Sequence, residues 1–161
     1  MDYSIDTSVA RCEWNLNDAL LTRYHDEEWG EPLHDDRQLF EFLALDGMQA
    51  GLSWNTILRK RENFRQAFDH FEIERVAGYN ETKVQDLLTN PGIVRNKAKI
   101  NAIIHNANRV IAIQQEFGSL DAYLWSFTGG VTIQNSWQTL AEIPATNPIS
   151  DAMSKALVAR G

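Results

Sequence analysis

The residues that could do chemistry gather in two short segments, 11–30 and 45–54. These segments carry four aromatic side chains: Trp14, Tyr24, Trp29 and Trp54. Aromatic faces stack on flat rings, and a positively charged ring over an indole gains about 0.5–2 kcal/mol more. A carboxylate at Asp46 could accept hydrogen bonds from such a ring and stabilise its charge. Any single tryptophan is more often a core residue, and Asp46 could equally sit at a helix end or on the surface, but the combination predicts a pocket.

A second candidate site consists of Cys12 and His25. A cysteine and a histidine at short separation can supply half of a zinc site, whereas a structural zinc normally has four ligands. No other histidine shows a partner spacing, so the residues alone favour a free thiol and a surface histidine. Because Cys12 is the only cysteine, the chain cannot form an internal disulfide, which favours a reducing compartment.

A third candidate site is basic and lies within about residues 80–110. This segment reads as a helix, then LLTNPGIVRNKAK, then a second helix. A tight turn at Gly92 and Ile93 would point backbone N–H groups outward, where they suit a phosphate. No acidic residue occurs between Asp86 and Glu116. The basic residues in that interval are Arg95, Lys97, Lys99 and Arg109.

The basic pattern resembles a helix-hairpin-helix, although the usual second glycine is replaced by Val94. Taken alone, it fits a helical turn with solvated lysines equally well. A second basic cluster, 59–65, could join the hairpin in one positive face that grips a nucleic-acid backbone without reading its sequence. Its members are Arg59, Lys60, Arg61 and Arg65.

The elements that must position these residues read mainly as helices. Apolar residues recur at helical spacing after Asp35-Asp36, Ser53 and Asn80, and again before Gly118. A short helix is expected at 121–127, and a last one capped by Ser150. Gly47 and Gly51 are expected to bracket a turn beside Asp46. The VTIQ stretch after Gly129-Gly130 reads as loop, so we predict an all-α fold and one domain over residues 1–161.

The composition limits the possible functions. The chain has 161 residues, 43% of them hydrophobic, and a net charge of −7. That charge argues against binding nucleic acid over the whole surface, but it allows a local basic face. The N-terminus does not read as a secretory signal, and no stretch approaches the roughly 20 apolar residues that cross a bilayer. We therefore expect a cytoplasmic monomer without membrane contact.

Several blocks, taken together and in order, resemble the type I 3-methyladenine DNA glycosylases, a branch of the helix-hairpin-helix glycosylases. They include RCEW, RYHDEEWG, GMQAGLSWNTILRKREN, GIVRNKAKINAIIHNA and ISDAMSKALVARG, and they run from about residue 11 to 161. The resemblance implies a helix-hairpin-helix fold. It also implies hydrolysis of the N-glycosidic bond of 3-methyladenine in alkylated double-stranded DNA, as a step of base-excision repair.

The same resemblance implies residue roles. Tyr24, Trp29 and Trp54, joined by Trp14, would stack the flipped base, and Asp46 would recognise it and stabilise the developing positive charge. Gly51 and Leu52 would approach the gap that the flipped base leaves. The hairpin residues that would bind DNA are Gly92, Ile93, Arg95, Lys97 and Lys99. Cys12 and His25 would be two of the four ligands of a structural zinc, and the N-terminal segment 11–54 would carry both zinc and base pocket.

Three departures from the family pattern change what we expect. The pocket carboxylate of the relatives is a glutamate, so Asp46 has a shorter reach. Leu21 stands where an aromatic, usually tyrosine, is expected. The relatives continue past the final ARG with a segment that supplies a second histidine and cysteine, which the printed sequence does not contain. A zinc held by two ligands would bind weakly.

The expected mechanism needs no general acid. Many relatives with this hairpin use an aspartate about two dozen residues after the hairpin glycine; here that region, 112–116, offers only Glu116, with Asp121 further on. A cationic base already has a weak bond to the sugar, so flipping, stacking and holding it near water could suffice. The alternatives are a non-catalytic binder of damaged DNA, a glycosylase for a different alkylated base, and a zinc-dependent regulator.

Overall fold

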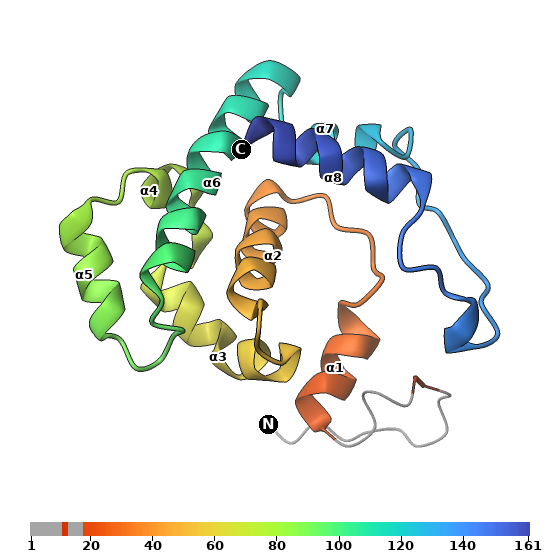
Figure 1. Ribbon diagram of the computed structural model, residues 1–161, viewed down its shortest axis with the longest axis horizontal. Coiled ribbons are helices and arrows are strands. Elements are labelled where there is room, and N and C mark those ends of the chain that lie inside the picture. Colours follow the sequence, from red (N-terminus) through yellow and green to blue (C-terminus); the bar gives the residue numbers. More distant parts are fainter. Residues whose placement is uncertain (1–10, 13–17) are drawn as a thin grey trace.

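The computed structural model describes residues 11–12 and 18–161, and within that part every regular element is a helix. The α-helices are α1 (Ala19–Glu27), α2 (Asp36–Gln49), α3 (Trp54–Ala67), α4 (Ile73–Ala77), α5 (Glu81–Thr89), α6 (Lys97–Phe117), α7 (Leu120–Ser126) and α8 (Pro148–Arg160). Two 3-10 turns, η2 (Asp69–Phe71) and η3 (Leu140–Glu142), complete the set. The predicted all-α fold is confirmed, and residues 131–134 form no strand (Figure 1).

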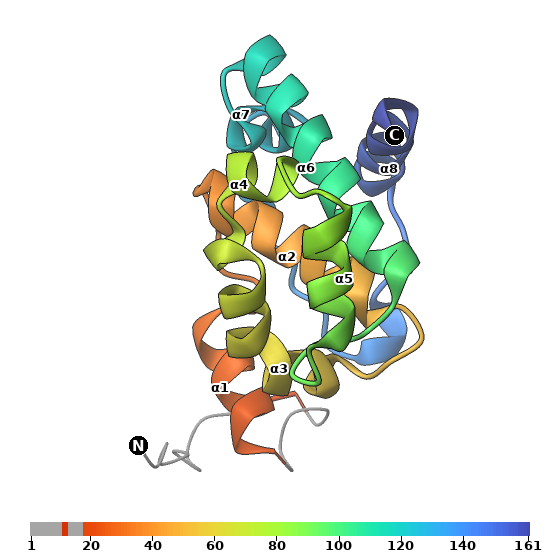
Figure 2. The ribbon, with the colours of Figure 1, turned by 90° about the vertical axis from the view of Figure 1, so that its left-hand side faces the viewer.

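Helix α2 lies in the middle of the molecule, and the other helices surround it (Figures 1 and 2). Helices α3, α6 and α7 pack directly on it, and α6 also packs on α4 and α5. The core is made of large apolar side chains with no exposed surface, among them Phe40, Leu45, Met48, Phe64 and Ile100. Burying each such side chain stabilises the folded state by about 1.5–3 kcal/mol. This packing fixes the position of α2 and of the residues that it carries.

The helix starts follow the predicted caps with one exception. The side chains of Asp35, Ser53 and Asn80 accept backbone N–H groups at the starts of α2, α3 and α5, which satisfies donors that a helix leaves free. The last helix instead begins three residues earlier than predicted. Asn147 caps α8, and Ser150 closes a capping box from the third position.

The turn predicted between Gly47 and Gly51 is wrong in its first half. Helix α2 continues through Gly47 and ends at Gln49. A glycine inside a helix costs about 1 kcal/mol, and burial of Leu45 and Met48 on either side outweighs that cost. Asp46 therefore lies in the last turn of a helix rather than beside a loop, so the fold of α2 determines its direction.

None of the described helices is both long and apolar enough to cross a membrane.

Candidate functional site

The core of the site is a contact between Tyr24 of α1 and Trp54, the first residue of α3. Their ring centroids lie 5.5 Å apart with the planes tilted by 57°. Ser53 fixes Trp54 by capping α3. The indole Nε1 of Trp54 is buried and makes no hydrogen bond of standard geometry with the described residues, although an interaction of its side chain with Tyr24 acts to lower the pKa of that phenol. A buried N–H without a full hydrogen bond costs about 1–3 kcal/mol.

Asp46 acts electrostatically on Tyr24. It lies at the exposed end of α2, yet burial raises the pKa of its carboxyl. Burial raises the pKa of Tyr24 as well, and the negative charges of Asp46 and Glu28 raise it further. The Tyr24 hydroxyl therefore lies in the field of both carboxylates, which keeps the phenol protonated and disposed to donate a hydrogen bond.

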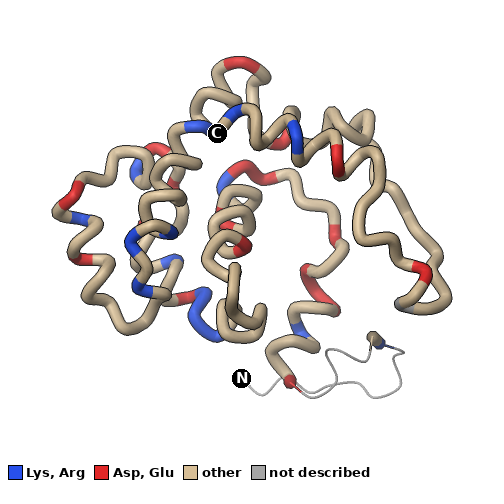
Figure 3. Tube along the Cα trace, in the orientation of Figure 1, with Lys and Arg blue, Asp and Glu red and all other residues tan. Residues whose placement is uncertain are grey.

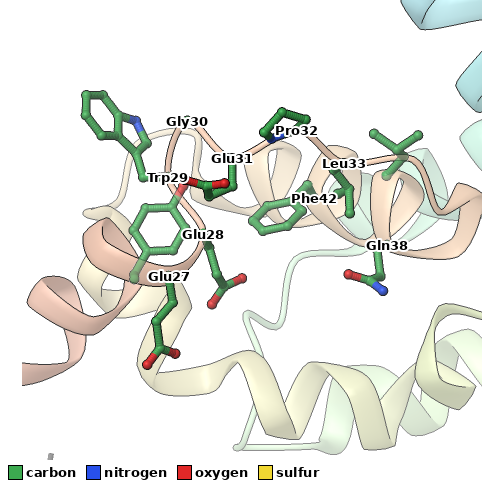
Figure 4. Close-up of a pocket in the computed structure, with 11 residues that line it drawn as sticks. Glu27, Glu28, Trp29, Gly30, Glu31, Pro32, Leu33, Gln38 and Phe42 are labelled. Carbon is green, nitrogen blue, oxygen red and sulfur yellow. The ribbon is translucent and has the colours of Figure 1, made fainter. Parts of the chain in front are cut away.

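A cavity of about 370 Å³ opens between the end of α1, the following linker and α2 (Figure 4). Its aromatic lining is Tyr24, Trp29 and Phe42, and its acidic lining is Glu27, Glu28 and Glu31. The volume falls within the range of small-molecule pockets. Aromatic faces next to carboxylates favour a flat, positively charged ring over a neutral one.

Phe42 and Glu28 are lining residues that sequence reasoning missed. Phe42 precedes Asp46 by four residues, so the two side chains lie on the same face of α2, one turn apart. That spacing was a usable signal. Glu28 stands next to Trp29 in the RYHDEEWG block, but its role depends on a partner from α3 that the sequence does not indicate.

That partner is Arg61, which contacts the lining residues Glu28 and Phe42. Its guanidinium donates to Glu28 at 2.6 Å and to Glu41 at 2.5 Å, and it lies over the Phe42 ring at 4.8 Å from the centroid. Glu41 is 5% exposed and also accepts hydrogen bonds from Arg65. Burying a carboxylate requires such pairing, and here the pairing joins α1, α2 and α3 around the cavity.

Trp29 and Trp54 occupy different environments. Trp29 is 49% exposed and stacks on His25, with 5.4 Å between the ring centroids. It lines the cavity mouth from the α1 side, where Figure 4 shows it next to Gly30. Trp14, the fourth predicted aromatic, lies outside the described residues. The structure thus brings Tyr24 and Trp54 into contact, places Asp46 close enough to act on Tyr24, and puts Trp29 on the lining of the cavity.

The hairpin forms between α5 and α6 as the sequence predicts. Gly92 donates its N–H to Asn90 Oδ1 at 2.8 Å. A Cβ on Gly92 would stand 3.1 Å from Cβ of Asn63, so the close approach of the hairpin to α3 favours glycine here. The Ile93 side chain is 3% exposed and belongs to the core. Its predicted contact with DNA can therefore involve only the backbone.

The predicted basic residues of the hairpin differ in their partners. Arg95 is exposed and makes no hydrogen bond or ion pair with the other residues that the structure describes. Lys97 Nζ pairs with Glu81 at 2.6 Å on the surface. Lys99 Nζ donates to the carbonyls of Met48 and Ala50 at 2.9 and 2.6 Å. Only Arg95 therefore presents an unpaired cation.

A projecting loop joins α2 to α3. Gly51 has φ = +78°, a left-handed conformation that favours glycine. Gln49 closes the turn, because its side chain donates to the Leu52 carbonyl at 2.7 Å and its carbonyl accepts the Leu52 N–H. The Leu52 side chain is 39% exposed. The approach of Gly51 and Leu52 to the gap left by a flipped base stays a prediction.

The second basic cluster does not form the free positive face that we expected. Figure 3 shows Lys and Arg along α3 and the first part of α6, but most of the α3 charges are neutralised. Arg59 pairs with Asp18, Arg61 and Arg65 pair with Glu41, and Lys60 donates to the carbonyls of the hairpin. The buried carboxylate and the hairpin carbonyls need these cations, so the cluster is structural.

The described residues do not form a complete zinc site. Cys12 is a free, half-buried thiol, and His25 Nδ1 lies 3.0 Å from Asp26 Oδ1. No group of three or more His, Cys, Asp and Glu side chains in 11–12 and 18–161 is arranged to hold a metal. Two candidate ligands fall short of the four that a structural zinc takes. Zinc at Cys12 and His25 stays a prediction.

The two carboxylates that follow the hairpin, Glu116 and Asp121, both have side-chain partners. Glu116 accepts two hydrogen bonds from Arg160, at 2.7 and 3.0 Å. Asp121 contacts His34 Nδ1 at 2.7 Å. Neither carboxylate lines the cavity next to Tyr24. That this region supplies no catalytic acid stays a prediction.

Known proteins match the chain over nearly its whole length. The family model for methyladenine glycosylase matches residues 14–161. DNA-3-methyladenine glycosylase 1 of Escherichia coli (strain K12) is 44% identical over 153 residues, which cover 95% of this chain and 82% of that protein. DNA-3-methyladenine glycosylase of Haemophilus influenzae is 38% identical, with 95% and 83% covered.

Solved structures agree with the family match. A crystal structure of 3-methyladenine DNA glycosylase I is similar with a TM-score of 0.89 and 46% identity, covering 94% of this chain and 84% of that one. The Staphylococcus aureus enzyme, solved to show the basis of 3-methyladenine recognition, gives 0.89 and 35%, with 93% and 80% covered. The chain belongs to the methyladenine glycosylase family.

Proposed function

We propose that this chain is a DNA-3-methyladenine glycosylase that removes the alkylated base from DNA in base-excision repair. The observation that carries the proposal is the arrangement of Asp46, Tyr24 and Trp54 beside an acidic, aromatic cavity in a chain of this family. Alkylation at N3 makes adenine a cation. Aromatic faces and carboxylates both attract that cation more than they attract neutral adenine, so the pocket selects the lesion by charge.

In the proposed mechanism the enzyme flips the nucleotide and holds the base, and the cationic base supplies the leaving tendency. Leu52 fills the gap in the duplex, and the hairpin with Arg95 grips the backbone. The Asp46 carboxylate faces the positive charge of the base and stabilises the sugar cation as the bond breaks. The C1′–N bond cleaves with its electron pair going to the base, which leaves neutral, and water adds to C1′ and loses its proton to solvent.

Trp54, which contacts the pocket residue Tyr24, has a further hydrogen-bonding role in the proposal. Its indole N–H is buried and makes no hydrogen bond of standard geometry in the described part of the chain. The flipped base carries ring nitrogens that can accept a hydrogen bond, so binding would satisfy this donor. A site that satisfies a buried donor only with the correct ligand discriminates by up to several kcal/mol.

We also propose that the substrate is double-stranded DNA and that the protein works as a monomer in the cytoplasm. The Leu52 loop supports a duplex substrate, because a wedge is useful only where a flipped base leaves a gap. The single cysteine fits a reducing compartment.

The test is release of free bases from methylated duplex DNA, resolved by chromatography. Release of 3-methyladenine with little 7-methylguanine would support the proposal. Release of a different alkylated base would reassign the pocket, and Leu21, which departs from the family pattern, would become the first residue to exchange for tyrosine. Binding of the duplex without release of any base would contradict catalysis and favour a binder of damaged DNA.

A further inference from the structure

We infer that Lys99 is a positioning residue that fixes the base-pocket end of α2 to the DNA-binding hairpin, rather than a ligand of the DNA backbone. This inference rests on the proposed function and assigns a mechanical role within it. Its observation is separate from the pocket: the Lys99 ammonium bonds the carbonyls of Met48 and Ala50, at 2.9 and 2.6 Å. Met48 lies in the last turn of α2 and Ala50 is the residue that caps its C-terminus, whereas Lys99 belongs to α6.

The two bonded carbonyls are ones that α2 itself cannot satisfy. The last four carbonyls of a helix lack an intrahelical donor, and the helix end carries partial negative charge. The last turn of α2 contains no basic residue of its own. An ammonium has three donors and a full charge, so Lys99 completes the α2 end from outside.

The backbone of Lys99 is fixed on the hairpin side. Asn96, the last residue before α6, caps that helix by accepting the Lys99 N–H at 3.1 Å. Lys99 therefore has its main chain bonded to the end of the hairpin and its side chain bonded to α2. A single residue of the third position in α6 bridges the two elements.

The α2 end that Lys99 holds carries the functional groups of the other half of the site. Asp46 lies in this last turn, and the Leu52 loop begins where the turn ends. Gln49, between the two bonded carbonyls, closes the loop by its contacts with Leu52. When the hairpin seats on a phosphate, Lys99 therefore sets the distance from that phosphate to the wedge and to the carboxylate.

The other basic residues of the hairpin show why Lys99 is different. Arg95 is exposed without a partner among the described residues, and in the proposed complex it contacts the DNA phosphate backbone. Lys99 is half-buried, and its bonds to carbonyls would have to break before it could reach DNA. A phosphate contact releases counterions when DNA binds, whereas a positioning contact does not. The two roles of Lys99 therefore predict different effects of its replacement on the salt dependence of DNA affinity.

The experiment measures two quantities in Lys99→Met, Lys99→Gln and the wild-type chain. The first is the slope of log Kd against log salt for duplex DNA. The second is the single-turnover rate of 3-methyladenine release at saturating enzyme. Arg95→Met is the positive control for a lost phosphate contact, with a slope change of about 0.9. Lys155→Met, an exposed lysine on the distant α8, is the matched control for loss of a charge and should change neither quantity.

If Lys99 is a positioning residue, Lys99→Met should keep the wild-type salt slope. Its single-turnover rate of release at saturating enzyme should fall about tenfold, equivalent to about 1.4 kcal/mol. Lys99→Gln keeps an N–H donor for the carbonyls, so its rate should recover to within about threefold of wild type. A slope change of about 0.9 in both variants with the saturated rate intact would overturn the inference. An unchanged slope and an unchanged rate in Lys99→Met would overturn it too.

The design separates this inference from the proposed function. If the wild-type chain released no base, the proposed function would fail, and the salt slope would still decide whether Lys99 contacts phosphate. If the wild-type chain released the base and Lys99→Met matched it, only the positioning role would fail.

Discussion

Replacing Arg61 by methionine tests how the pocket wall is held. Arg61 is 11% exposed and bridges Glu28 and the 6%-exposed Glu41, with its guanidinium also over Phe42. Removing one partner of a buried ion pair costs about 3–5 kcal/mol, because the remaining carboxylate stays buried. Arg65 still donates to Glu41 at 3.0 and 3.1 Å, which places the expected loss at the lower end, about 3 kcal/mol.

The assay is thermal and urea unfolding of Arg61→Met, with Arg65→Met as the matched control. For a chain of this size, about 3 kcal/mol corresponds to a fall in Tm of roughly 6–12 °C. Arg65 is 36% exposed and leaves Arg61 on Glu41, so its replacement should cost about 1 kcal/mol. Replacing Glu41 by methionine in the Arg61→Met background should recover stability, because no buried charge then remains unpaired.

A loss below about 1 kcal/mol for Arg61→Met, or one equal to that of Arg65→Met, would refute the reasoning. Glu41 would then be solvated or neutral rather than held by Arg61. The pocket wall would in that case depend on apolar packing alone.

Three further predictions follow from the charges and ligands. Because burial raises the pKa of Asp46, release of 3-methyladenine should fall on the acid side with a midpoint above the ordinary 3.8, and Asp46→Asn, measured across the same pH range, should lose that limb. Asp36 is partly buried, but hydrogen bonds from Gln114 and the start of α7 lower its pKa. The contribution of its charge to stability is complete above pH 3.8 and is lost as pH falls through the lowered pKa, so Asp36→Ala should cost about 1–3 kcal/mol in urea unfolding at pH 7 and less at the acid extreme. Zinc titrated calorimetrically should bind weakly through Cys12 and His25, and one tightly retained zinc per chain would contradict the two-ligand account.

The helices were predictable because their signals are local. Capping by Asp35, Ser53 and Asn80 depends on contacts within four residues, and the structure confirms each cap. Gly47 misled the prediction, because its tolerance inside α2 depends on burial of Leu45 and Met48 against other helices. Tertiary packing of that kind overrides a local breaker signal, and a single sequence does not display it.

The residue types of the site were predictable from the sequence, but the hydrogen bonds and ion pairs that join those residues were less so. Tyr24 and Trp54 are in contact and Asp46 acts on Tyr24, while their roles in base binding stay predictions. The basic residues could not be sorted into free and paired ones, because their partners lie far along the chain. Lys99 bonds residues 48 and 50, and Arg61 bonds residues 28 and 41. Such pairs depend on how the helices pack, which charge counting along the sequence does not reveal.

The most direct test of the central claim compares the wild-type chain with Asp46→Asn and Asp46→Glu in single-turnover release of 3-methyladenine from methylated duplex DNA. A charge-assisted hydrogen bond contributes about 1.5–3 kcal/mol, so Asp46→Asn should slow release roughly 10- to 150-fold, while Asp46→Glu keeps the charge and should stay within about tenfold. Because Asp46 is exposed at the end of α2, removing its charge should leave Tm at pH 7 close to the wild-type value. Full activity in Asp46→Asn, with the fold intact, would contradict the account.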